Sequence, residues 1–190
     1  MFFRSQIVAV LIAIAVGVEV EQIRKIVTIE DHPWVIKNET CLKTTSNTSC
    51  RSPCYTGLLF DLLHKIDAEL KNLNNCKIHE VDSYGVLNKT VKAWSGLIGS
   101  IANNKSDLAL APLNSTQVKN SGIKLSSPFI NNKAKNNTLA LGFPKGSKIE
   151  KAFSHLIKKL VNQRHVEQLK EKWFVEEKNL WSKNKQITPN

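Results

Sequence analysis

The stretch from Trp94 to Phe129 constrains the fold of this chain more than any other part of the sequence. Within it, Gly96–Asn103 has the pattern of a short helix, and Asp107–Ala111 is an apolar run typical of a buried strand. A loop that begins at Pro112 follows this strand. Open α/β sheets bind ligands beyond the carboxyl ends of their strands. The order of helix, strand and loop therefore predicts an α/β sheet with a binding edge near Pro112.

The amino terminus has the layout of a secretory signal peptide. One positive charge, at Arg4, precedes the unbroken apolar run Ile7–Val18, which ends in small residues around Gly17. We predict that residues 1–18 are a cleaved signal peptide and that the protein is secreted. The alternative is an uncleaved anchor at the plasma membrane, although a spanning helix needs about 20 apolar residues. No later run of the sequence approaches that length.

Composition and charge narrow the class of protein further. The chain has 190 residues, of which 42% are hydrophobic and 23% charged, so it has room for one globular domain but not for a second. The net charge of +11 is concentrated after Lys145. Because export makes nucleic acid an unsuitable partner, the charge is read as a solvated basic face or as a surface for an acidic glycan or anionic membrane.

Cysteines and asparagines also fit an exported protein. The even number of cysteines predicts two disulfides, with three possible connectivities, among Cys41, Cys50, Cys54 and Cys76. A zinc site is the alternative for the C-x3-C pair, but no histidine stands at the usual spacing to complete it. The N-x-S/T pattern predicts glycosylation at Asn38, Asn47, Asn88, Asn104, Asn114 and Asn136.

The rest of the chain carries further strand and helix patterns. Strands are predicted at Ile23–Ile29, Lys77–Val81 and Thr138–Phe143. A helix that begins near Leu58 has one apolar stripe, and Asn38–Pro53 before it is predicted as a polar loop tethered by cysteines. Two closing helices have apolar stripes at Phe153, Leu156, Ile157, Leu160 and Val161, and at Val166, Leu169, Trp173 and Phe174. The polar run Asn131–Asn137 predicts a surface loop.

These segments together resemble the amino-acid-binding domain of ionotropic glutamate receptors and of bacterial periplasmic amino-acid-binding proteins. The family patterns W-N-G-x-x-G and A-P-L-T align with Trp94 and Pro112, and a Y-x-G-x-x-x-D-L pattern aligns Gly57 and Asp61. The closing P-K-G-S and K-W-F motifs match as well, and the cysteine loop resembles that of NMDA-type receptors. The resemblance implies a three-layer open sheet flanked by helices, a single lobe of the periplasmic-binding-protein type II fold.

A single lobe is implied because the family builds its first lobe from the beginning and the end of the domain. Here the two parts are joined directly, at about residues 130–138, and no residues remain for the second lobe or for membrane helices. We therefore expect residues 23–175 to form the first lobe, followed by a charged tail at 176–190. The chain is then either a domain reduced in evolution to a secreted protein or a truncated receptor gene product.

The family's ligand-binding positions carry over by motif to Tyr84, Pro112, Asn114 and Lys119. The resemblance implies that Pro112 accepts from the ligand's amino group, that Tyr84 covers the ligand, and that the other two hold its carboxylate. The family has Thr at Asn114 and Arg at Lys119, and lysine lacks the planar fork that grips a carboxylate with two bonds. We therefore expect weak binding of glutamate or glycine.

The sequence contains no catalytic pattern. It has no H-E-x-x-H, no G-x-S-x-G and no Gly-rich phosphate loop, so we predict neither catalytic residues, nor a metal, nor a cofactor. The predicted function is extracellular recognition of an amino acid, related to that of ligand-gated cation channels. The alternative is a secreted single lobe that docks on a receptor subunit or on an acidic surface.

Overall fold

The computed structural model describes residues 21–132 and 137–174. The predicted signal segment 1–18, Asn136 and the tail 176–190 lie outside the described residues. Within the described part of the chain, six strands form a central mixed sheet with the order β4-β1-β7-β10-β8, and β9 pairs with β10. The predicted α/β fold, with helices on both faces of an open sheet, is confirmed.

Parallel strands form one half of this sheet and antiparallel strands the other. The parallel strands are β4 (Lys77–Glu80), β1 (Lys25–Thr28) and β7 (Leu108–Leu113). The antiparallel strands are β10 (Asn137–Phe143), β8 (Lys124–Leu125) and β9 (Ile130–Asn132). All six residues of β7 are buried, as its apolar sequence and central position predict.

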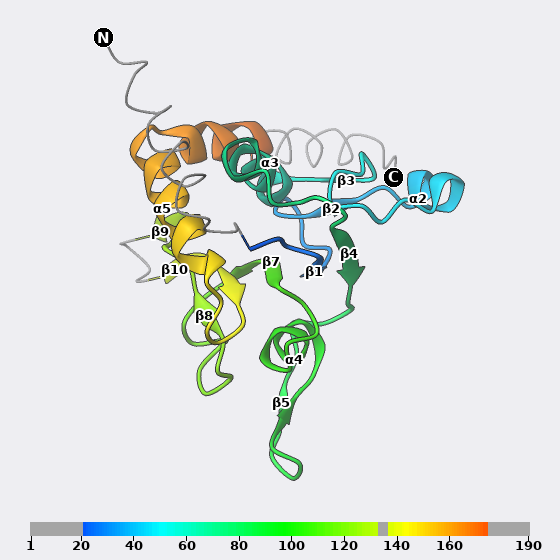
Figure 1. The fold of residues 1–190 in the computed structure, drawn as a ribbon, viewed down its shortest axis with the longest axis vertical. Coiled ribbons are helices and arrows are strands. Elements are labelled where there is room, and N and C mark those ends of the chain that lie inside the picture. Colours follow the sequence, from blue (N-terminus) through cyan, green and yellow to red (C-terminus); the bar gives the residue numbers. More distant parts are fainter. Residues whose placement is uncertain (1–20, 133–136, 175–190) are drawn as a thin grey trace, which may run out of the picture.

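Helices cover both faces of the sheet and bury a separate apolar cluster on each. Helices α3 (Leu58–Leu70) and α5 (Ile149–Asn162) pack with Ile26 and Leu108 on one face. Helix α4 (Gly96–Ala102) packs with Val27 on the other face. In Figure 1, α3 lies above β1 and β7, and α4 lies below them. The alternation of Ile26 and Val27 between the two clusters follows from the two-residue period of a strand.

The segment predicted as a polar loop, Asn38–Pro53, contains a helix, and this correction has a local cause. Helix α2 (Glu39–Thr45) begins because the Asn38 side chain accepts a hydrogen bond from the Cys41 backbone N–H at 2.9 Å. It has no buried residue, so it left no hydrophobic pattern in the sequence.

Two small sheets pair β2 (Ile36–Lys37) with β3 (Tyr55–Thr56) and β5 (Leu87–Asn88) with β6 (Ala93–Trp94).

The carboxyl-terminal part completes the sheet begun by the amino-terminal part. Strand β10 pairs with β7, as expected for Thr138–Phe143. Residues 165–174 are helical, and the Asp61 carboxylate of α3 accepts hydrogen bonds from Lys172 Nζ and Trp173 Nε1, both at 2.9 Å. Val161 was predicted as a member of the buried apolar stripe of the first closing helix. Its side chain is 38% exposed, so this part of the prediction is wrong.

The predicted surface loop Asn131–Asn137 is also partly wrong, because its ends are strand residues. Asn132 pairs with Asn137 and Asn131 with Thr138 in an antiparallel ladder between β9 and β10. Pairing of this kind satisfies backbone N–H and C=O groups whatever the side chains are, so a polar run is compatible with it.

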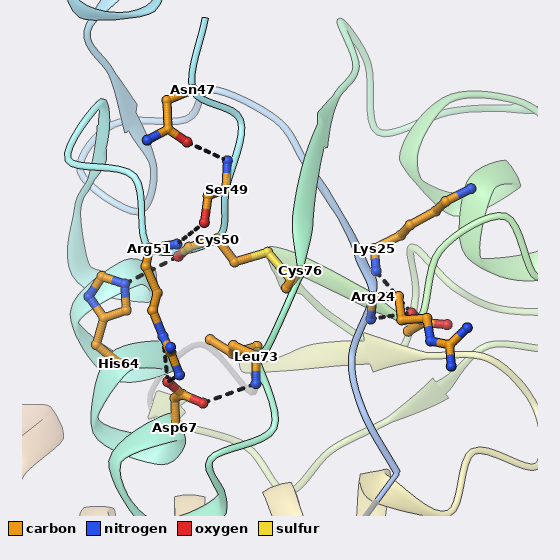
Figure 2. Close-up of a disulfide and its surroundings, with 11 residues drawn as sticks. Arg24, Lys25, Asn47, Ser49, Cys50, Arg51, His64, Asp67, Leu73 and Cys76 are labelled. Carbon is orange, nitrogen blue, oxygen red and sulfur yellow. Dashed lines mark hydrogen bonds and ion pairs between the residues drawn. A yellow bond between two sulfur atoms is a disulfide. The ribbon is translucent and has the colours of Figure 1, made fainter. Parts of the chain in front are cut away.

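Two disulfides are present, Cys41–Cys54 and Cys50–Cys76. Figure 2 shows the second, with hydrogen bonds that brace its surroundings. The Arg51 guanidinium donates to Asp67 Oδ2 from Nη2 at 2.6 Å and from Nε at 3.1 Å. Asp67 Oδ1 accepts from the Leu73 backbone N–H at 3.1 Å.

None of the described helices combines the length and the apolar character that crossing a membrane requires.

Candidate functional site

The carboxyl ends of the three parallel strands meet at one edge of the sheet. Asp31 follows β1, Tyr84 follows β4, and Asn114 follows β7. This is the edge at which open α/β sheets bind ligands. The sheet thus brings three of the family-derived positions, Tyr84, Pro112 and Asn114, to the edge predicted from the sequence, with Lys119 in the turn that follows.

Tyr84 is held rigidly in this edge. Its side chain is half-buried and packs against the α4-side cluster, and its hydroxyl donates to Asp31 Oδ2 at 2.5 Å. Burial raises the pKa of Tyr84, and the hydrogen bond to Asp31 raises it further, so the phenol stays neutral and a donor. The Tyr84 carbonyl accepts from Ile98 N–H at 2.9 Å, which ties the residue to the first turn of α4.

Pro112 lies within β7, which is a correction to the predicted loop. The strand continues to Leu113, and Pro112 is buried in it. The pairing of β7 with β10 shifts register between the partner pairs Ala109–Gly142 and Leu113–Ala140. A proline has no N–H for a ladder and is tolerated at such an irregularity.

Asn114 begins the turn that leaves β7. Its Oδ1 accepts from the Gln117 backbone N–H at 2.9 Å, and its own backbone N–H donates to Gln117 Oε1 at 2.9 Å. This reciprocal pair is the capping arrangement of a residue and its third successor. The side-chain oxygen of Asn114 is therefore already engaged in shaping the turn.

Lys119 is exposed in the turn formed by residues 115–120. Its backbone N–H donates to the Thr116 carbonyl at 3.4 Å. Within the described residues, no ion pair involves its ammonium group. The segments that follow the parallel strands therefore carry a fixed phenol, a capped polar turn and an exposed cation.

Two residues of this edge, Asp31 and Gln117, did not emerge from the sequence. Gln117 carried a recognisable signal, since N-x-x-Q has the spacing of a capping pair. Asp31 carried none, because its partner Tyr84 is distant in the chain and only the parallel pairing of β1 with β4 brings them together.

The remaining candidate features are the glycosylation sequons, the surface hollows and the potential metal ligands. Most sequon asparagines are exposed, namely Asn38, Asn47, Asn88 and Asn104, whereas Asn114 is half-buried. Two surface hollows, of about 220 and 600 Å³, lie at the opposite, amino-terminal edge of the parallel strands. Among the described residues, His, Cys, Asp and Glu side chains do not gather in a group that could hold a metal ion.

Comparisons with known proteins point to one family. Residues 22–136 match the family described as ligated ion channel L-glutamate- and glycine-binding site. Glutamate receptor 3 of Rattus norvegicus and of Homo sapiens are each 27% identical over 105 residues, which is 55% of this chain and 11% of the receptor. The chain thus spans about a tenth of the length of these curated relatives.

A solved structure supports the fold. The structure titled Drosophila muscle GluRIIB complex with glutamate superposes with a TM-score of 0.65 at 12% sequence identity. The superposition covers 80% of this chain and 98% of that chain. At this identity, the likeness shows the arrangement of helices and strands alone.

Proposed function

Because this chain belongs to the family of the ligated ion channel L-glutamate- and glycine-binding site, we propose that it is the first lobe of an extracellular amino-acid-recognition domain. The observation that carries this proposal is the match over residues 22–136, which includes all four family-derived positions at or beside one edge of the sheet. Export through a signal peptide at 1–18 and glycosylation at the exposed sequons are part of the same proposal.

The single-lobe proposal has support at the junction between β9 and β10. The family match ends at residue 136, inside the short segment 133–136 that separates the two strands. Strand β10 and α5 then return to the sheet and to α3. The family resemblance implies a crossing to a second lobe at this point, and we propose that residues 23–175 lack that lobe.

We propose that an amino acid would meet this edge through its carboxylate. Lys119 supplies the charge, and the turn at Asn114 supplies polar groups, while Tyr84 provides a rigid ring beside them. One lobe covers only one side of such a ligand and leaves its amino group and side chain in water. Affinity for a small polar molecule requires burial with every charge paired. Dissociation constants in the millimolar range are expected.

The substitution Lys119→Arg is expected to tighten glutamate binding by about tenfold. Arginine would grip the carboxylate with two parallel bonds, and a charge-assisted hydrogen bond contributes about 1.5–3 kcal/mol. The measurement is titration of the full chain with glutamate and with glycine, followed by NMR shifts of the Tyr84 and Asn114 amides. Lys119→Gln is the matched control, because it keeps the exposed turn but removes the charge, and it should abolish the shifts.

Two outcomes would contradict this proposal. Micromolar affinity in the unmodified chain would show that a second surface is unnecessary. Equal shifts in the Arg and Gln variants would show that Lys119 does not hold the carboxylate. Because Lys119 is exposed and unpaired among the described residues, neither variant is expected to alter folding.

A docking role on a receptor subunit is the second candidate, and one observation favours it. Two polar groups of the candidate site are already used locally, since the Tyr84 hydroxyl donates to Asp31 and the Asn114 side-chain oxygen caps the turn at Gln117. Size-exclusion chromatography of the secreted chain with the extracellular domain of a receptor subunit should then show co-elution that glutamate does not change. Separate elution at micromolar concentrations would remove this candidate.

A further inference from the structure

A basic hollow lies at the edge of the sheet opposite the candidate ligand site. It has a volume of about 600 Å³ and is formed where β1 and β4 begin and α4 ends. Its polar lining consists of Arg24, Lys25, Lys77, His79, Ser100, Asn104, Lys105 and Asp107. Four of these side chains, Arg24, Lys25, Lys77 and Lys105, are cationic. We call these residues the basic hollow.

Cationic side chains outnumber carboxylates in the basic hollow by four to one. Its single carboxylate, Asp107, is engaged through Oδ2 by the backbone N–H groups of Arg24 at 2.8 Å and Lys25 at 2.9 Å. Within the part of the chain that the structure describes, none of the four cationic side chains forms an ion pair. Elsewhere the chain does pair its lysines, as Lys37 does with Glu80 at 2.7 Å.

The strand register places like charges side by side. Lys25 and Lys77 are direct partners in the parallel ladder of β1 and β4, and strands in a sheet lie about 4.8 Å apart. Like charges directly opposite one another on a sheet are destabilising, and an anion bound beside them would offset this repulsion. Figure 2 shows the side chains of Arg24 and Lys25 extending away from the Cys50–Cys76 disulfide.

The shape of the site favours a chain-like anion over a flat membrane. A hollow of this volume encloses part of a ligand, whereas a bilayer surface meets a flat or convex face. Among the described residues, the most exposed large apolar side chains, Val86 and Val91, belong to the β5–β6 hairpin that follows the opposite edge of the sheet, and the exposed Val161 belongs to α5. The basic hollow therefore lacks the apolar residues that insert at a membrane interface.

We propose that the basic hollow binds a sulfated polysaccharide. Sulfate groups along one chain would lie between Lys25 and Lys77 and extend toward Lys105 and Arg24. This site is separate from the candidate amino-acid site, since the two lie at opposite edges of the parallel strands. The exposed sequon Asn104 is on its rim, so a glycan attached there would compete with the polysaccharide.

The test measures binding of a fluorescein-labelled, fully sulfated heparin octasaccharide to the full chain, with Asn104→Gln present throughout to remove the sequon. The triple variant Arg24→Gln, Lys77→Gln and Lys105→Gln is expected to weaken binding about tenfold, because each exposed ion pair contributes a modest amount. The triple variant Lys65→Gln, Lys89→Gln and Lys158→Gln is the matched control. It removes the same charge from exposed sites outside the hollow and should weaken binding less than about twofold.

A second measurement locates the site without relying on the variants. The octasaccharide should protect Lys25, Lys77 and Lys105 from acetylation, read by mass spectrometry, and leave Lys65 and Lys89 reactive. Equal weakening in the two triple variants would show an effect of net charge alone and overturn the proposal. So would stronger binding to anionic phospholipid vesicles or to single-stranded DNA than to the octasaccharide, or protection spread over all five lysines.

Discussion

Replacing Cys50 and Cys76 together by alanine is expected to lower the free energy of unfolding by about 3–4 kcal/mol. The disulfide closes a loop with a sequence separation of 26 residues, and cutting such a loop restores conformational freedom to the unfolded chain. Both cysteines are buried, at 0% and 2% exposure, so the alanines also leave unfilled space. A loss of this size is a large part of the roughly 5–15 kcal/mol that stabilises a domain.

The position of this disulfide explains why its loss should affect the whole domain. Cys76 immediately precedes Lys77, where β4 begins, and the Cys50 backbone N–H donates to the Cys76 carbonyl at 3.1 Å. The bond between Arg51 and Asp67 then fastens the same segment to α3. The disulfide therefore ties the edge strand of the central sheet to the helix that covers it.

The second disulfide provides the matched control. Cys41–Cys54 has a sequence separation of only 13, and it fastens α2, which buries no residue. Its double alanine variant should lose less stability than the Cys50 and Cys76 variant. Urea denaturation followed by tryptophan fluorescence measures both. A loss below about 1 kcal/mol for the Cys50 and Cys76 variant, or a larger loss for the control, would contradict the expectation.

The sequence was sufficient to predict those parts of the fold that carry a strong apolar pattern. The buried run before Pro112 and the stripe of α3 were both placed correctly, because burial on a sheet or under a helix requires apolar side chains at fixed spacing. Helix α2 was missed for the opposite reason. It buries nothing, and only the capping residue Asn38 marks its beginning.

Contacts between residues that are distant in the chain could not be predicted from the sequence. The count of four cysteines predicts two disulfides, but the choice among three connectivities depends on which Cα atoms the fold brings together. The bond between Tyr84 and Asp31 is similar, since it depends on the order of strands in the sheet. The placement of Pro112 in a loop was wrong because a register shift with β10 admits a proline into the strand.

The substitution Gly85→Ala is expected to destabilise the protein by at least about 3 kcal/mol and to disorganise the candidate ligand site. Gly85 has a φ angle of +104°, which is costly for any residue with a Cβ atom. A Cβ atom there would overlap the carbonyl oxygen of Ser95 and approach its carbonyl carbon to 2.7 Å. Because both atoms belong to the backbone, neither can move aside without shifting the chain before α4.

The shift of the backbone caused by Gly85→Ala should disturb the candidate ligand site through Tyr84. The first turn of α4 is hydrogen-bonded to this loop. The Leu97 N–H donates to the Ser83 carbonyl at 3.0 Å, and the Ile98 N–H donates to the Tyr84 carbonyl at 2.9 Å. Pushing the loop away from α4 would lengthen these bonds and turn the phenol away from Asp31. The NMR signals of Tyr84 and Asp31 should shift even under conditions in which the variant remains folded.

Gly122→Ala separates the effect of the backbone angle from the effect of the overlap. Gly122 also has a positive φ angle, of +77°, but a Cβ atom there would meet nothing within 4 Å. This control should cost only about 1 kcal/mol, the penalty of a left-handed angle alone. Urea denaturation of the two variants gives the comparison. Equal losses would show that the contact with Ser95 is relieved easily, and that the loop bearing Tyr84 is not fixed by its packing against α4.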